Sequence, residues 1–215
     1  ENERLKDSIA AISSRSRAGH AYLIEGERGS GRKEFAKLLA AGLMCGGAGR
    51  RPCGACKDCR KVFSGIHPDL FELLPEKDKK SISVEQIRRL TEQLYTLPND
   101  ARRKVCIIPD AQAMTAPAQN ALLKSLEEPP PFAAFILTAL SGRELRGTIA
   151  SRLIPLRTGR VSREGVLRIL RERLPGTPES ELSAAADATQ GCVGKALEAA
   201  RDPMFGKCSA FCAEF

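Results

Sequence analysis

A short apolar run, a glycine-rich turn and an amphipathic segment follow one another between residues 20 and 44. No other feature of the chain limits the possible folds as much. His20 to Ile24 is typical of a buried strand, and the apolar spacing from Arg32 to Met44 predicts a helix. The turn between them, Gly26 to Gly31, contains three glycines. Such a strand–turn–helix unit belongs in a fold in which strands alternate with helices.

The same alternation continues to about residue 158. Strands are predicted at 70–74, 105–108, 132–137 and 153–156, and helices at 3–15, 84–97 and 117–128. Ser83 and Thr115 are suited to cap two of these helices. Continuous apolar runs are typical of strands that are buried on both faces. Residues 1–158 are therefore predicted to form an α/β domain with a parallel sheet covered on both sides.

The pattern changes after Thr158, where helices are predicted with no strand between them. Three of them are expected, at 161–174, 179–189 and 193–200. We therefore expect a small helical domain over residues 159–201, and residues 202–215 are interpreted as the start of a further domain.

The composition favours a soluble protein with one sizeable core. The chain has 215 residues, of which 42% are hydrophobic. It has no run of 18 apolar residues and no signal-peptide pattern near its N-terminus, so we expect a cytoplasmic protein and no membrane partner. The formal net charge of +8 suits a partner that carries phosphates, without proving one.

The glycine-rich turn is close to a phosphate-binding loop, whose pattern is G-x-x-x-x-G-K-[ST]. Gly26 and Gly31 take the outer positions, and Gly29 lies between them. Arg32, however, stands at the lysine position, and Lys33 stands where a hydroxyl would bind magnesium. Moving the pattern by one residue makes Lys33 the lysine, but the next residue is then a glutamate. We expect a degenerate loop that keeps the structural turn, with weak nucleotide affinity as the most it could retain.

The second half of an ATP site is expected where the predicted strand 105–108 ends. A working site has a carboxylate for magnesium there, followed by a catalytic glutamate. This chain has Pro109, which offers no ligand, and Asp110, which is one methylene shorter than glutamate. Phosphoryl transfer depends on the magnesium that these groups hold. ATP hydrolysis is therefore not expected.

Half of the 8 cysteines lie close together in the sequence. They are Cys45, Cys53, Cys56 and Cys59. Four thiolates in a short loop match a closed, tetrahedral structural zinc site, in a module of about residues 45–66. An iron–sulfur cluster and free thiols are the alternatives. His67 is a spare candidate ligand, although a local structural role suits it better. Cys106 lies in an apolar run and is expected to behave as a small hydrophobe.

Several segments together resemble one protein family. They are the run His20-Ala21-Tyr22-Leu23, the four-cysteine insert, His67-Pro68-Asp69, and Asn120-Ala121-Leu122-Leu123-Lys124-Ser125-Leu126-Glu127-Glu128-Pro129-Pro130. In these segments the chain is similar to the bacterial DNA polymerase III clamp-loader subunits, gamma/tau and delta prime, and the similarity extends from about residue 3 to residue 201. The resemblance implies an AAA+ fold: a P-loop NTPase-like parallel sheet domain with a zinc-binding insert, a three-helix lid, and a C-terminal collar domain that would begin at 202–215.

The departures from the phosphate-loop pattern indicate which branch of the family the chain resembles. Gamma/tau keeps an intact ATP site and delta prime does not, so Arg32, Lys33, Pro109 and Asp110 favour the delta prime type. The segment from Gly191 to Leu197 resembles the family's sensor 2 motif. An active motor carries an arginine there, where this chain has glycine.

The resemblance also implies a catalytic role for one arginine. Ser151-Arg152-Leu153 is similar to the Ser-Arg-Cys motif of the family. In that motif the arginine is supplied in trans to a neighbouring ATP site, where it stabilises charge on the transferring phosphoryl group. Arg152 is therefore the predicted arginine finger, and an ordinary surface ion pair is the alternative.

The resemblance implies a non-hydrolysing stator subunit that helps to load the sliding clamp onto primed DNA. Its partners would be the gamma/tau and delta subunits, the clamp and primed DNA. The chain would be no enzyme by itself but a component of the DNA polymerase III holoenzyme. Arg88 and Arg89 are candidate phosphate contacts or simply part of a solvated face. An ATP-hydrolysing gamma/tau-like motor subunit and a zinc-containing nucleic-acid-binding module remain as alternative functions.

Overall fold

The structure is a computed structural model that describes residues 3–14, 19–202 and 204–205. These residues separate into two compact units. The sheet unit contains Arg4–Glu25 and Arg32–Arg157, and the helical unit combines Gly26–Gly31 with the chain from Thr158 on. Most of the predicted further domain at 202–215 lies outside the described residues.

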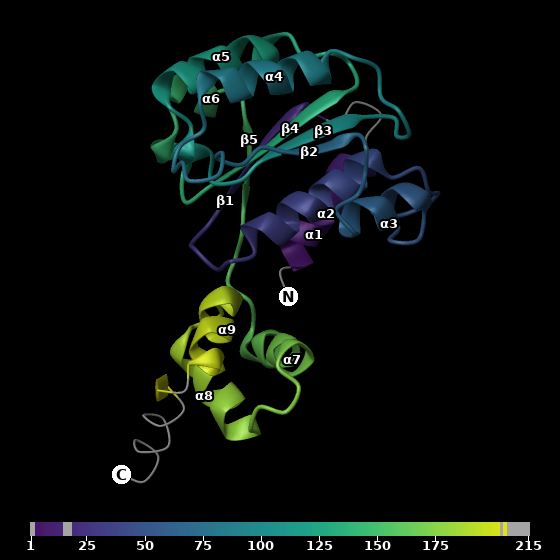
Figure 1. The fold of residues 1–215 in the computed structure, drawn as a ribbon. Coiled ribbons are helices and arrows are strands. Elements are labelled where there is room, and N and C mark those ends of the chain that lie inside the picture. Colours follow the sequence, from purple (N-terminus) through teal and green to yellow (C-terminus); the bar gives the residue numbers. More distant parts are fainter. Residues whose placement is uncertain (1–2, 15–18, 203, 206–215) are drawn as a thin grey trace. The chain divides into compact units, whose positions relative to one another are not determined.

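A five-stranded parallel sheet forms the centre of the sheet unit, in the order β2-β3-β4-β1-β5 (Figure 1). Its strands are β1 (Ala21–Glu25), β2 (Leu70–Glu72), β3 (Lys104–Ile108), β4 (Ala133–Ala139) and β5 (Ile154–Arg157). Every residue of β3 and β4 is buried, as expected for central strands covered on both faces. The predicted parallel α/β architecture is confirmed.

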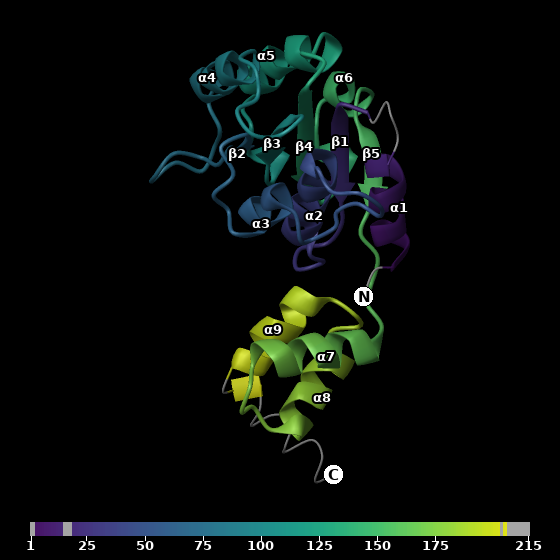
Figure 2. The same ribbon diagram turned by 90° about the vertical axis from the view of Figure 1, so that its right-hand side faces the viewer.

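Helices cover both faces of the sheet (Figures 1 and 2). One layer consists of α4 (Val84–Leu94), α5 (Ala116–Glu127) and α6 (Gly147–Ala150), and the other of α1 (Glu3–Ser14), α2 (Arg32–Met44) and α3 (Lys57–Phe63). Each layer has its own apolar core against the sheet. Two short 3-10 turns, Ala111–Ala113 and Gly142–Glu144, follow β3 and β4. Among the described residues, no helix is both long enough and apolar enough to cross a bilayer.

Several predicted boundaries were wrong. The helix that begins after Ser83 ends at Leu94 instead of residue 97, because the residue before Pro98 is pushed away from helical backbone angles. Strand β2 is three residues long instead of five. Helix α3, inside the cysteine module, was not predicted. The predicted caps are confirmed, since Ser83 Oγ accepts from Gln86 N and Thr115 Oγ1 accepts from Ala118 N.

The helical unit contains the three helices that the sequence predicts. They are α7 (Arg163–Arg173), α8 (Glu179–Ala188) and α9 (Val193–Arg201). Their apolar faces meet in a small core that includes Val166, Leu170, Leu182, Ala185 and Ala196. Ser162 caps α7 by accepting from Gly165 N at 3.2 Å.

Candidate functional site

The glycine-rich loop adopts a backbone that requires glycine at two positions. Gly29 and Gly31 have φ of 84° and 83°, in the left-handed region that other L-residues rarely adopt. Helix α2 begins at Arg32, directly after the loop. Glycine at these two positions therefore maintains the tight turn that the sequence pattern predicts.

The side chain at the lysine position of this loop is bound within its own chain. Arg32 is only 9% exposed, and its Nη2 donates to Asp110 Oδ1 at 3.0 Å. Its Nη1 is buried and has no hydrogen-bond partner among the described residues. Lys33, one residue later, is exposed. The guanidinium of Arg32 therefore forms an ion pair with the carboxylate of Asp110, which follows the end of β3.

Asp110 is held in an uncommon backbone conformation at this point. Its φ is 48°, in the left-handed region, which aspartate tolerates better than most residues. Its backbone N–H donates to Thr138 Oγ1 on the neighbouring strand β4, at 3.0 Å. The sequence identified Arg32 and Asp110 as departures from an ATP site. It did not predict that they would pair with each other.

In the helical unit, the loop packs against the start of α9. Gly194 N donates to Gly29 O at 2.8 Å, and a Cβ at residue 194 would lie 2.5 Å from Gly29 Cα. No larger side chain fits at position 194 in this arrangement. Thr158 Oγ1 donates to Ser30 Oγ at 2.7 Å. Gly194, which the sequence analysis compares with the sensor arginine of the family's motors, thus makes a close backbone contact.

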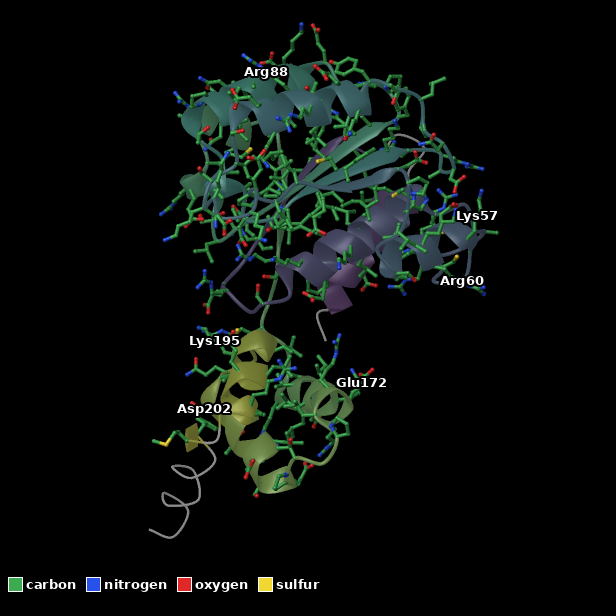
Figure 3. All side chains as sticks on the ribbon, viewed as in Figure 1. Lys57, Arg60, Arg88, Glu172, Lys195 and Asp202 are labelled. Carbon is green, nitrogen blue, oxygen red and sulfur yellow. The ribbon has the colours of Figure 1, made fainter. Side chains whose placement is uncertain are left out.

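A cavity of about 450 Å³ lies beside this contact within the helical unit. The carboxylate of Glu27 is 3.5 Å from Lys195 Nζ and 3.9 Å from Arg160 Nη2. Lys195, labelled in Figure 3, directly follows Gly194. Its charge faces an acidic group of the loop itself.

Arg152 lies just after α6 and is tethered by its own chain. Its Nη1 donates to Thr148 O at 2.7 Å, and its Nη2 is 2.6 Å from Glu127 Oε1 at the end of α5. The side chain is still 37% exposed. Glu127 belongs to the motif that carries the family resemblance, but the sequence gave no sign of this ion pair. The guanidinium is therefore oriented and remains accessible to solvent.

The four clustered cysteines come together in space. Their sulfur atoms all lie within 4.8 Å of one another, and those of Cys45 and Cys56 are 3.9 Å apart. Four sulfurs around a tetrahedral zinc ion would be about 3.8 Å apart, from a Zn–S distance of about 2.3 Å. These residues could hold a metal ion. His67 does not belong to the group, and its ring nitrogens instead lie near Asp58 Oδ1 and Asp69 N.

The backbone around the cysteines favours thiolate at selected positions. Cys56 N donates to Cys53 Sγ at 3.3 Å, and Cys59 N donates to Cys56 Sγ at 3.4 Å as α3 begins. Burial raises the pKa of Cys56, but hydrogen bonds from Cys59 and its neighbours lower it to about 6. Burial raises the pKa of Cys45 and Cys59. A Cβ on Gly47 would lie 2.7 Å from Cys53 Sγ, so the loop needs glycine there.

The remaining candidates lie on the surface or in the core. Arg88, labelled in Figure 3, and Arg89 are both exposed on α4. Lys57 and Arg60 are exposed on α3 (Figure 3). Cys106 is fully buried on β3, where burial raises its pKa, and it behaves as the small hydrophobe that was predicted.

Comparison with known proteins identifies the family. The family model described as DNA polymerase III, delta subunit, matches residues 1–161. Subunit delta prime of DNA polymerase III from Yersinia pestis is 40% identical over 137 residues, which cover 63% of this chain and 40% of the relative. The chain belongs to the DNA polymerase III delta prime family. The delta prime subunit of Bacillus subtilis (strain 168) is also 40% identical, over 136 residues that cover 63% of this chain and 41% of that relative.

The chain spans about two fifths of the length of these delta prime relatives. The chain is also similar to the tau subunit of DNA polymerase III. Subunit tau of Escherichia coli (strain K12) is 37% identical over 153 residues, which are 71% of this chain and 23% of that relative.

Solved structures agree on the fold. A gamma-subunit-related protein of Thermotoga maritima has a TM-score of 0.58 and 27% identity, over 80% of this chain and 52% of that one. The Holliday junction branch migration motor RuvB of the same organism has a TM-score of 0.63 at 14% identity, over 94% of this chain and 61% of that one. The RuvB likeness concerns the fold alone, which is the AAA+ type.

Proposed function

We propose that this chain serves as a non-hydrolysing, stator-type subunit of the clamp loader. In this role it helps to place the sliding clamp on primed DNA and is no enzyme by itself. Its partners are the gamma/tau and delta subunits, the clamp and DNA, and it works in the cytoplasm. Membership of the delta prime family supports the assembly, and the chemistry of the degenerate loop supports the passive role.

The ion pair between Arg32 and Asp110 carries the proposal. In a working site, a lysine binds the β- and γ-phosphates, and a hydroxyl and a carboxylate hold magnesium. Here a guanidinium occupies the lysine position and is neutralised by the carboxylate nearest the end of β3. Lys33 and Pro109 offer no ligand for magnesium. Together these residues favour a glycine-rich loop that is retained for its structural turn and not for ATP hydrolysis.

The contacts of Arg152 support a role as arginine finger in trans. Two acceptors, Thr148 O and Glu127 Oε1, fix the direction of the guanidinium. An arginine that is held in this way loses little side-chain freedom when it meets a phosphoryl group on a neighbouring subunit. The remaining exposed fraction leaves room for that contact.

The test of the finger is an ATPase assay on a complex rebuilt from the full-length protein, gamma, delta, clamp and primed DNA. Arg152→Ala is expected to lower clamp-stimulated turnover by a factor on the order of 10³. Arg146→Ala is the matched control, because Arg146 is exposed at the start of the same helix, α6. If turnover with Arg152→Ala equalled that of the control, the finger assignment would be wrong.

We also propose that Cys45, Cys53, Cys56 and Cys59 bind a structural zinc ion. The closeness of the four sulfurs and the N–H···S bonds support this choice. Four thiolates leave no open position on the metal, so zinc would supply stability and no chemistry. Metal analysis of the purified full-length protein is expected to give one zinc ion per chain.

The domain arrangement proposed for this function follows the sequence boundaries. Residues 1–158 form the AAA+ sheet domain with the zinc module at about 45–66, and residues 159–201 form the lid. The three-helix core of the helical unit supports the lid assignment.

A further inference from the structure

A carboxylate and an imidazole face each other in the interior, next to the cysteine cluster. Asp58 lies in the first turn of α3, beside Cys59, and His67 lies just before β2. Their side chains are 6% and 0% exposed. His67 Nε2 is 3.7 Å from Asp58 Oδ1, and neither atom has a hydrogen-bond partner among the described residues.

The other ring nitrogen determines which atom of His67 carries the proton. The backbone N–H of Asp69 donates to His67 Nδ1 at 3.0 Å, so Nδ1 is an acceptor. A neutral imidazole then carries its hydrogen on Nε2, which is the atom that faces Asp58. The buried carboxylate is therefore opposed by an N–H donor, and that donor compensates part of the cost of its burial.

From His67 the contacts continue into the sheet. The carboxylate of Asp69, fully buried, accepts from the backbone N–H groups of Asn99, Asp100 and Ala101 at 2.7, 2.7 and 2.9 Å. The carbonyl of Asp69 accepts from Val105 N in β3 at 2.9 Å. These bonds hold the loop that leads into β3. A series of buried polar contacts through Asp58, His67 and Asp69 thus connects α3 with that loop.

We infer that Asp58 and His67 are positioning residues that couple the metal-binding module to the sheet. The inference rests on the proposed metal site for its metal-dependent part. Asp58 is the neighbour of a cysteine ligand, and His67 precedes the aspartate that orders residues 99–101. Partners just outside the ligands of a metal commonly fix those ligands, and losing one costs about 10- to 100-fold in metal affinity. The pair therefore couples metal binding by the cysteine cluster to the order of the loop at 99–101, which leads into β3.

The experiment measures two quantities on the full-length protein: the rate of Zn²⁺ release to a chelator and amide hydrogen exchange at residues 99–101. Asp58→Ala and His67→Ala are each expected to speed release about 10- to 100-fold. Each is also expected to raise amide exchange at 99–101 about tenfold or more. The double variant should show no more than the larger single effect, because coupled residues do not add. Lys57→Ala, an exposed neighbour on α3, is the matched control and should leave both quantities unchanged.

The outcomes separate the coupling from the metal site. Additive effects of the two variants, or exchange at 99–101 that stays at the wild-type rate in both, would overturn the coupling. If the wild-type protein held no Zn²⁺, the metal proposal would fail, and amide exchange in the variants would still decide whether the buried link exists. Asp58→Asn keeps the shape of the side chain and serves if the alanine variant does not fold. Its expected effect lies between those of alanine and the wild type.

Discussion

At the scale of single residues, the pair formed by Arg32 and Asp110 is expected to stabilise the fold, beside its part in the proposed loss of ATP chemistry. Asp110→Asn removes the charge but keeps a side chain that tolerates φ of 48°. We expect this change to lower the free energy of unfolding by about 1 kcal/mol, because Asp110 is partly exposed and solvent screens the pair. Asp110→Ala should cost about 1 kcal/mol more, for the left-handed backbone. Urea unfolding at pH 7 measures both.

Glu34→Gln provides the control for this series. Glu34 is an exposed carboxylate in the first turn of α2, two residues from Arg32. Its substitution should change the free energy of unfolding by less than about 0.5 kcal/mol. If Asp110→Asn were as mild as this control, the ion pair would contribute nothing to stability.

Glu127 offers a second prediction at this scale, through its contact with Arg152. Without Glu127 the guanidinium keeps its bonds to Thr148 O and Ser151 Oγ, both made by Nη1, and its direction becomes less defined. We expect Glu127→Ala to lower clamp-stimulated ATP turnover in the rebuilt complex about tenfold, less than the loss of the arginine itself. Glu127→Asp should recover part of that loss.

The neighbouring Glu128 is the matched control for this measurement. It lies next to Glu127, and its side chain is exposed. Glu128→Ala should leave turnover unchanged. An equal loss in both variants would show that the charge of this segment matters and the tether of Arg152 does not.

At the scale of elements, the loop at 99–101 depends on one buried carboxylate. Burial raises the pKa of Asp69, but the N–H groups of Ala101, Asn99 and Asp100 lower it below its usual value of 3.8. A lowered pKa in the folded state means that the charged form contributes stability above about pH 4. That contribution is lost as the pH falls through the lower, folded-state pKa.

Asp69→Ala is therefore expected to lower the free energy of unfolding at pH 7 by about 3 kcal/mol, since backbone donors lose their acceptor. The wild type should lose stability more steeply than the variant as the pH falls below about 4. Urea unfolding as a function of pH measures the two slopes. Parallel curves would mean that Asp69 does not titrate with folding.

The sequence indicated most elements, and its failures have physical causes. The five strands and the long helices follow from apolar spacing and caps such as Ser83, which are local signals. Helix α3 has no apolar period of its own, because seven residues are too few and its inner positions include Asp58 and Cys59. Its packing depends on the cysteine cluster and on contacts with α2, which no local pattern reports.

The candidate site was predicted by residue type but not by contact. The cysteine spacing directly indicated the group of four sulfurs that could hold a metal ion. In contrast, the pairs Arg32–Asp110 and Arg152–Glu127 join residues from different elements of the sheet unit, and a single sequence gives no information on which of many charges meet.

At the scale of the whole molecule, the proposed loss of ATP chemistry predicts how the protein responds to nucleotide. A ligand bound at 100 times its Kd would stabilise the folded protein by about 2.7 kcal/mol. In a chain of this size that gain would raise Tm by about 5 °C or more. We expect magnesium and ATP at millimolar concentration to raise Tm by less than about 1 °C in a thermal unfolding scan. A gamma/tau subunit with an intact loop is the positive control, and a shift of several degrees accompanied by turnover in this protein would contradict the stator role.

The pairing of Arg32 with Asp110 also bears on how such a chain could change over generations. A lysine at position 32 alone would remove the guanidinium that binds the Asp110 carboxylate. Replacing Asp110 alone would leave the buried guanidinium of Arg32 without its ion-pair partner. Neither step would bring back a magnesium ligand at Lys33 or Pro109. Each series of substitutions toward a working ATP site therefore begins with the loss of this ion pair. It gives no ATP hydrolysis until several substitutions have accumulated. The ion pair would thus oppose the return of ATP hydrolysis in the proposed stator subunit.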